Sequence, residues 1–327
     1  MSWKNKKVLV TGAGGFIGSH LAERLVKEGA DVRAFVRYNS GGSWGWLDHS
    51  VLKKQMHITS GDVRDREGVH EAMKGVHTVF HLAALVGIPY SYASPASYVR
   101  TNVEGTLNVM QCALEAGVKK VVHTSTSEVY GTARTPKIKE THVLRGQSPY
   151  SASKIAADKI AEAFHLSFGL PVATVRPFNT YGPRQSARAV IPTIMTQVLT
   201  RSKVELGYLD SLRDFNYVAD TVEGFILAAL KSGAVGEVIN IGSGRTISIG
   251  DLAKMIFKIS GKKIKVVENK TRLRPVMSEV RRLCADNTHA KKILGWEPRT
   301  RLEKGLEETF FWVEGNLKYY RSGYYAV

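Results

Sequence analysis

Three glycines at three-residue spacing follow an apolar stretch near the N-terminus, and they constrain the fold more than any other feature. Residues 8–10 are Val-Leu-Val, and Gly12, Gly15 and Gly18 come next, ahead of a segment whose apolar residues recur at helical spacing. Glycines at a strand-to-helix turn let backbone N–H groups approach an anion at the helix N-terminus without a Cβ clash. The pattern predicts a strand-turn-helix unit that holds a pyrophosphate; a tight turn without a ligand is the alternative.

Short apolar runs alternate with helical patterns through the first half of the chain. This alternation predicts an α/β fold with a doubly wound, parallel, Rossmann-like sheet. The runs that we interpret as strands cover residues 8–10, 32–36, 57–59, 76–82, 120–124 and 172–175, and a later strand is expected at 237–241.

The pattern becomes irregular from Pro177, and helices are expected at 189–200, 249–260, 288–294 and 302–319. We therefore expect two interleaved domains. Residues 1–176, with roughly 215–242 returning to them, would form a Rossmann-like NAD(P)-binding domain. Residues 177–214 and 243–327 would form a smaller C-terminal α/β domain for the substrate.

Composition excludes several classes of partner. The formal net charge is +17, but Lys and Arg are spread along the 327 residues without a nucleic-acid-binding module, so no nucleic-acid partner is expected. An anionic substrate would still be attracted by a cationic cleft. No stretch is apolar enough for a membrane span or signal peptide, which favours a cytoplasmic protein. Cys112 and Cys284 lack disulfide or zinc-ligand spacing, so no metal is expected.

Tyr150 and Lys154 are four residues apart in a segment with helical spacing. This spacing puts the phenol and the ammonium on one helix face, where a cation favours the phenolate and would make Tyr150 a base. Such pairs are common on helices and are structural more often than catalytic.

The order of three motifs favours a catalytic role for Tyr150 and Lys154. The glycine turn is followed by Ser125-Thr126-Ser127-Glu128-Val-Tyr-Gly131 and then by Tyr150-Ser-Ala-Ser-Lys154. In this order the chain resembles the extended short-chain dehydrogenase/reductase superfamily, and specifically its nucleotide-sugar 4,6-dehydratases, over essentially its whole length. The resemblance implies a homodimer through helices beginning near Ala96 and Tyr150.

The cofactor site is expected around the glycine turn, including Phe16 and Ile17. Val36 and Arg37 stand where an acid usually binds the adenosine ribose of NAD. Arg37 could accept a 2′-phosphate, which favours NADP over NAD; an exposed arginine in an NAD enzyme is the alternative. The resemblance adds Asp62 and Val63 at the adenine, and Ala83 and Ala84 beside the ribose. Asp62 could instead cap a helix at 64–73.

Glu128 distinguishes a dehydratase from an epimerase. Once C4 of the sugar is a ketone, a nearby carboxylate can remove the acidified C5 proton while the C6 hydroxyl leaves as water. Thr126 would share the proton at Tyr150. Ser127 stands where dTDP-glucose dehydratases carry Asp, so Glu128 would protonate the leaving hydroxyl itself or Ser127 would relay a proton through water. A solvated loop acid is the alternative for Glu128.

The resemblance also places substrate-binding residues in the second half of the chain. One of them would donate a hydrogen bond to the diphosphate, others would form the wall around the nucleobase, and arginines and an acid would hold the phosphate and the ribose. Arg272 is a weaker candidate beside them. The set is Asn179, Arg184, Val190, Ile191, Arg213, Arg274 and Glu279.

An unusual loop at residues 38–47 carries Trp44 and Trp46. It is similar to a bacterial group that acts on UDP-N-acetylglucosamine, which makes this nucleotide sugar the expected substrate. The tryptophans would make a contact, across subunits or against residues 48–54. Two other functions stay open: a 4-epimerase of the same fold, and a cofactor-binding protein without catalysis.

Overall fold

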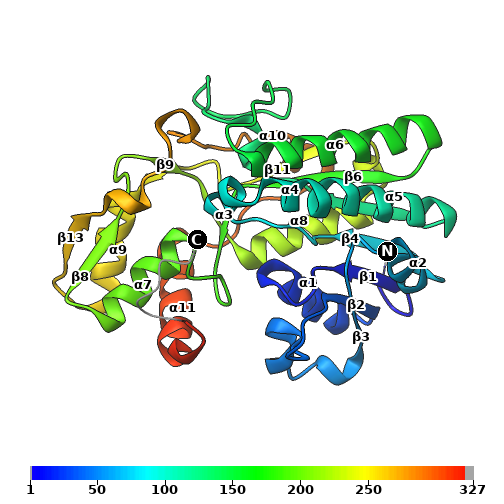
Figure 1. Ribbon diagram of the computed structural model, residues 1–327, viewed down its shortest axis with the longest axis horizontal. Coiled ribbons are helices and arrows are strands. Elements are labelled where there is room, and N and C mark those ends of the chain that lie inside the picture. The colour runs from blue at the N-terminus through cyan, green and yellow to red at the C-terminus, as the bar shows by residue number, and fades with distance from the viewer. Residues whose placement is uncertain (1, 321–327) are drawn as a thin grey trace.

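The computed structural model describes residues 2–320. Its centre is a seven-stranded sheet with the order β11-β6-β5-β4-β1-β2-β3 (Figure 1). Every neighbouring pair is parallel, so the predicted doubly wound sheet is confirmed. The strands are β1 (Lys7–Thr11), β2 (Asp31–Arg37), β3 (Met56–Gly61), β4 (Thr78–His81), β5 (Lys120–Thr124), β6 (Val172–Pro177) and β11 (Val238–Ile241).

Helices cover both faces of this sheet because its strands are apolar on both sides. Val8 and Val10 of β1 belong to one buried cluster and Leu9 to another, as expected when successive side chains point to opposite faces. The first cluster is shared with α1 (Phe16–Lys27), α8 (Val218–Leu230) and α10 (Thr288–Leu294). The second is shared with α2 (Arg66–Met73), α5 (Gly105–Glu115) and α6 (Pro149–Phe168).

The helical segment before β5 is not continuous. After α3 (Ile88–Ala93), the short helix α4 (Pro95–Tyr98) runs into a π-helical turn, Val99–Glu104, and only then into α5. Asn102 lies fully buried in this turn. Its side chain bonds to the N–H of Leu85 at 2.8 Å, to the carbonyl of Leu85 at 3.0 Å and to Ser153 Oγ at 3.0 Å. Asn102 thus ties the loop after β4 to α6.

The smaller lobe lies beside the sheet and has its own apolar core (Figure 1). Its strands pair in twos: β7 (Asn179–Tyr181) with β10 (Phe215–Tyr217), β8 (Lys203–Leu206) with β13 (Lys265–Glu268), and β9 (Leu212–Arg213) with β12 (Ile247–Ser248). Its helices are α7 (Val190–Thr200), α9 (Ile249–Ser260) and α11 (Leu302–Gly315).

The helix expected at 302–319 ends at Gly315, and a separate 3-10 turn, Leu317–Tyr319, follows. Residues 321–327 of the predicted second domain lie outside the described residues. Within the described part, no helix combines the length and the apolar character needed to cross a membrane.

Candidate active site

A cavity of about 1340 Å³ runs along the edge where the sheet strands end. Strands β1 to β6 all contribute residues at or just after their last positions, and the smaller lobe supplies the opposite wall. The strand-end residues are Gly12, Arg37, Asp62, Ala83, Thr124 and Pro177. Because β1 and β4 are neighbours whose chain connections leave in opposite directions, this edge is where open α/β sheets bind ligands.

The glycine turn lines the cavity just after the end of β1. Gly12 has a φ of +71°, which disfavours other residues, and a Cβ on Gly18 would clash with the carbonyl oxygen of Gly12. Phe16 and Ile17 begin α1 and also line the cavity. Their N–H groups belong to the first helical turn, which has no helix carbonyls to bind. A cradle without Cβ atoms at a helix N-terminus fits a dinucleotide pyrophosphate.

The far end of the cavity carries the residues predicted for the adenosine. Arg37 is exposed at the end of β2, and Asp62 accepts hydrogen bonds from Arg64 Nε at 3.0 Å and Nη2 at 2.6 Å. Hydrogen bonding from Arg64 lowers the pKa of Asp62. Asp62 does not cap α2, because Asp65 does so by accepting from the N–H of Glu67 at 3.1 Å.

Two other residues predicted around the cofactor differ in their surroundings. Ala84 lines the cavity with Ala83, just after β4. Val63 also lines the cavity but is mostly buried, and a Cβ on Gly105 would lie 2.7 Å from its Cγ2. The α5 helix therefore begins in close contact with the end of the cavity that is predicted to hold the adenosine.

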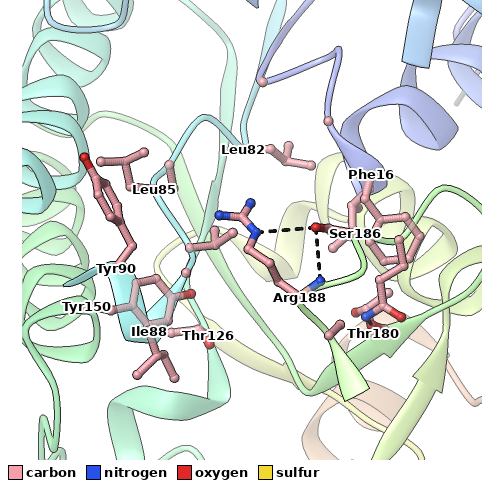
Figure 2. A pocket seen from close by; sticks show the side chains of 18 of the residues that line it. Phe16, Leu82, Leu85, Ile88, Tyr90, Thr126, Tyr150, Thr180, Ser186 and Arg188 are labelled. Atoms are coloured by element: carbon pink, nitrogen blue, oxygen red, sulfur yellow. Dashed lines mark hydrogen bonds between the residues drawn. The ribbon is translucent and has the colours of Figure 1, made fainter. Parts of the chain in front are cut away.

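Thr126, Ser127 and Glu128 follow β5 directly and line the cavity. Thr126 Oγ1 accepts from the N–H of Glu128 at 3.3 Å and starts the 3-10 turn Ser127–Tyr130. Tyr150 lies in the first turn of α6, which begins after a capping box made by Ser148 and Ser151. Figure 2 shows the Tyr150 ring beside Thr126.

The electrostatics of Tyr150 and Lys154 differ from the sequence-based expectation. Burial raises the pKa of Tyr150, and the hydrogen bond from Thr126 opposes this rise only in part. Burial also lowers the pKa of Lys154 to about 8. Lys154 Nζ donates to the carbonyl oxygen of Thr124 at 2.6 Å and makes no hydrogen bond to Tyr150. In the protein without a cofactor, desolvation of the phenolate outweighs the effect of neighbouring groups on the pKa of Tyr150.

Asp158, one turn after Lys154, is a buried anchor that the sequence analysis missed. It accepts from Ser125 Oγ at 2.6 Å, from Arg176 Nη2 at 2.9 Å and from His123 Nε2 at 3.1 Å. Burial alone would raise the pKa of Asp158, but the hydrogen bond from His123 and the neighbouring cations lower it to about 2. The carboxylate fixes β5, β6 and α6 relative to one another, next to the residues predicted to be catalytic.

Charged residues predicted for catalysis and for the diphosphate come together on the opposite wall. Arg213 Nη2 donates to Glu279 Oε1 at 3.0 Å, and Ser211 Oγ donates to the same oxygen at 2.9 Å. Arg274 Nε lies 3.9 Å from Glu279 Oε2, and Arg274 Nη1 lies 3.8 Å from Glu128 Oε2. Arg274 thus lies between Glu128 and Glu279, and Arg213 of β9 binds the same Glu279.

The other residues predicted to bind substrate divide into those that line the cavity and one, Arg184, that does not. Asn179, Val190 and Ile191 line the cavity, with Asn179 Nδ2 donating to the carbonyl of Asp214 at 3.3 Å. Arg272 lines it as well.

Arg184 does not belong to this group. Its Nη2 lies 3.0 Å from both carboxylate oxygens of Glu23, and its Nη1 donates to Ser19 Oγ at 3.1 Å. It is absent from the cavity wall. In this structure Arg184 fastens the segment after β7 to α1, and its predicted role in substrate binding stays a prediction.

The structure also adds wall residues that sequence reasoning missed. Leu85, Ile88 and Tyr90 line the cavity after β4, and Arg188 faces them from the smaller lobe (Figure 2). Arg188 Nε donates to Ser186 Oγ at 3.4 Å. The position of residues 85–90 after a strand of the sheet was the available signal. Among the described residues, no cluster of His, Cys, Asp and Glu could hold a metal ion.

Comparison with known proteins agrees with this geometry. The sequence model of a family described as GDP-mannose 4,6 dehydratase matches residues 9–309. A UDP-N-acetyl-alpha-D-glucosaminuronate decarboxylase of Bacillus cytotoxicus is 35% identical over 94% of this chain and 97% of its own. The crystal structure of DesIV, a dTDP-glucose 4,6-dehydratase from Streptomyces venezuelae with NAD bound, has a TM-score of 0.88 and 29% identity, and covers 96% of this chain and 99% of its own.

The relatives differ in length and in reaction. A trifunctional UDP-glucose 4,6-dehydratase, UDP-4-keto-6-deoxy-D-glucose 3,5-epimerase and UDP-4-keto-L-rhamnose-reductase of Arabidopsis thaliana is 30% identical over 98% of this chain, which spans 49% of that protein. Relatives named UDP-glucuronate 4-epimerase match as well. Since the sequence and structural matches extend over nearly the whole chain, the protein belongs to the NAD-dependent nucleotide-sugar dehydratase and epimerase family of the short-chain dehydrogenase/reductase type.

Proposed function

We propose that the protein is a nucleotide-sugar 4,6-dehydratase that converts UDP-N-acetylglucosamine into the 4-keto-6-deoxy sugar. The observation that carries the proposal is the position of Glu128. Three acids line the cavity among the described residues: Asp62 at the adenosine end, Glu279 bound by Arg213, and Glu128 next to Thr126. Glu128 is thus the cavity-lining carboxylate next to Thr126, and its charge acts on Tyr150, the proposed base.

A nicotinamide cofactor, held by the glycine turn and Lys154, would supply the hydride chemistry between C4 and C6. Tyr150 would accept the proton of the C4 hydroxyl, with Thr126 holding that hydroxyl in line. Since burial raises the pKa of Tyr150 in the protein alone, the positive ring of the oxidised cofactor is the charge expected to favour the phenolate. Lys154, anchored on Thr124, would hold the cofactor ribose.

Glu128 would act once C4 is a ketone. Its carboxylate would remove the C5 proton while the C6 hydroxyl leaves as water, and it would return a proton to C5 after hydride reaches C6. Glu128 or a water held by Ser127 would protonate the leaving hydroxyl. Arg213 and Arg274 would bind the diphosphate, because guanidinium donors match phosphate oxygens.

We further propose that the cofactor is NADP. Val36 is buried and Arg37 is exposed at the end of β2, so no acid stands at this position to repel a 2′-phosphate. The nearby Asn39 side chain is bonded to Ser43 within its own loop, so Arg37 is the residue proposed to bind the 2′-phosphate. The test is to measure the affinities of the wild-type protein and of the Arg37→Ala variant for NADP and for NAD. A preference for NAD that the substitution leaves unchanged would contradict it.

The substrate is tested by proton NMR of the protein with UDP-N-acetylglucosamine and cofactor in D2O. A new C6 methyl signal with deuterium at C5 is the expected result, and Glu128→Gln should abolish it. Glu162→Gln, which changes an exposed acid on α6, is the matched control.

Other products would identify a rival. Conversion to the galacto isomer that survives Glu128→Gln would indicate a 4-epimerase. Loss of carbon dioxide from the corresponding uronic acid would indicate a decarboxylase. Cofactor binding without conversion of UDP, GDP or dTDP sugars would leave a protein that only binds cofactor.

We also keep the homodimer, the cytoplasmic location and a division into two domains as proposals, with α10 reassigned to the first domain because it packs in the core on the α1 face of the sheet. Leu114 of α5 and Leu166 and Phe168 of α6 are exposed, which supports association through these helices. Light scattering tests the dimer, and a monomeric mass would contradict it.

A further inference from the structure

Residues 38–49, which we call the tryptophan strap, run from the end of β2 to the 3-10 turn Gly45–His49. Trp44 and Trp46 are half-buried in it. Asp48 orders the strap from within, since it accepts from Ser43 Oγ at 2.6 Å and from the N–H of Trp44 at 3.1 Å. Within one chain, the strap makes contacts on both of its sides.

One side of the strap contacts the glycine turn. Trp46 N–H donates to the carbonyl oxygen of Gly14 at 3.0 Å. The two backbones are so close that a Cβ on Gly14 would lie 2.5 Å from the carbonyl oxygen of Trp44. Gly45 has a φ of +63°, and a Cβ there would clash with the same Gly14 oxygen. The strap is thus fitted to the glycine turn backbone against backbone.

This contact fixes one peptide of the turn at both ends. The peptide between Gly14 and Gly15 has its carbonyl bound by Trp46 and its N–H bound by the carbonyl of Gly12 at 3.0 Å. Because a peptide is planar, fixing both groups sets the direction in which α1 starts. The N–H groups of Phe16 and Ile17 in the first turn of α1 are therefore oriented before any ligand binds.

The other side of the strap contacts the end of the smaller lobe. The Trp46 ring lies 5.3 Å from Trp312 and 5.6 Å from Tyr319, and His49 lies 4.6 Å from Tyr319, all between ring centroids. Trp312 packs against the core of the smaller lobe, whereas Trp44 packs against the core on the α1 face of the sheet. The strap therefore joins the two cores beside the glycine turn.

We propose that Trp46 is a positioning residue for the dinucleotide: by locking the strap onto Trp312 and Tyr319 it holds the glycine turn ready for the pyrophosphate and slows cofactor release. Ser43, Trp44 and Gly45 line the cavity, whereas the Trp46 side chain does not, so Trp46 acts through the strap. The inference depends on dinucleotide binding alone and is independent of which nucleotide-sugar reaction the protein catalyses. An enzyme that reoxidises its cofactor within each cycle has no need to release it between turnovers.

The test is calorimetric titration of the full chain with NAD and NADP, followed by stopped-flow measurement of dissociation of the tighter one. Trp46→Ala should weaken cofactor binding about tenfold, chiefly through faster dissociation, because the turn must then be ordered on binding. Trp46→Phe keeps an aromatic ring and should stay within about threefold of wild type. UDP affinity, measured with cofactor saturating, should be unchanged in both variants.

Tyr319→Ala provides a second test that leaves Trp46 in place, and it should also speed cofactor release. Cofactor affinity of a folded Trp46→Ala variant equal to wild type would overturn the proposal. An equal loss of affinity for cofactor and for UDP would also overturn it, because that result would mean general destabilisation. A wild-type protein that binds cofactor but converts no sugar would contradict the proposed function and leave this inference standing.

Discussion

Replacing Lys154 with methionine should make the protein more stable at pH 7 while abolishing turnover. Burial lowers the pKa of Lys154 from its usual 10.5 to about 8. The unfolded chain therefore binds this proton more tightly than the folded protein. Folded-state stability falls as the pH decreases from about 10.5 to about 8 and stays lower below that window.

The size of the effect follows from these values. At 1.36 kcal/mol per pH unit, the gap between the two pKa values corresponds to roughly 3 kcal/mol at pH 7. Methionine removes the buried ammonium but also loses the hydrogen bond to Thr124, worth about 1 kcal/mol. Lys154→Met should therefore raise the free energy of unfolding by about 2 kcal/mol at pH 7, and at pH 9.5 this gain should nearly vanish.

The assay is urea unfolding at pH 7 and pH 9.5, followed by circular dichroism and tryptophan fluorescence, whose transitions must coincide for a two-state treatment. Lys254→Met is the matched control: that lysine is largely exposed beside Asp251, so its loss should change stability by less than about 0.5 kcal/mol. A Lys154→Met protein less stable than wild type at pH 7 would refute the reasoning, as would a gain that persists undiminished at pH 9.5.

Three further substitutions test other parts of the site. Asp158→Asn should lower the free energy of unfolding by about 3–5 kcal/mol, because buried cations lose their counterion. Ser125→Ala should lower it by only about 1 kcal/mol. Urea unfolding measures both losses, and losses of similar size would contradict the role of Asp158 as a buried anchor. Gly18→Ala should abolish cofactor binding by calorimetry, while Gly233→Ala, where a Cβ meets nothing within 4 Å, should not. Arg184→Ala should reduce stability yet leave UDP affinity unchanged, and a clear loss of UDP binding would restore Arg184 to the substrate site.

Elements with strong local signals could be predicted from the sequence almost to the residue. The helices expected at 249–260 and 288–294 are observed at those positions. Both end at a glycine in the left-handed conformation, Gly261 and Gly295, and Ser248 caps the first. The seven strands of the sheet were located for a similar reason, since apolar runs and turn residues are properties of neighbouring positions.

Contacts between distant residues could not be predicted in this way. Nothing near Arg184 in the sequence reveals that its partner is Glu23 of α1, and the motif resemblance suggested a different role. Trp46 and Trp312 lie 266 positions apart in the sequence, so their contact depends on the assembled lobes. The helical spacing shows that Lys154 is near Tyr150 but cannot show how deeply Tyr150 is buried, and this burial raises the pKa of the phenol.

The π-helical turn Val99–Glu104 has a consequence for comparing sequences and for redesigning the protein. A π turn holds one residue more than the α-helical turn it replaces. Deleting one residue there would let α4 and α5 join as a regular helix with the flanking side chains still in register, because the π turn absorbs its extra residue, so only side chains within the turn would change direction. Asn102 would swing away from Leu85, and the support of the wall facing Arg188 would be lost. Alignments that close a one-residue gap in this segment would therefore equate side chains that face different directions.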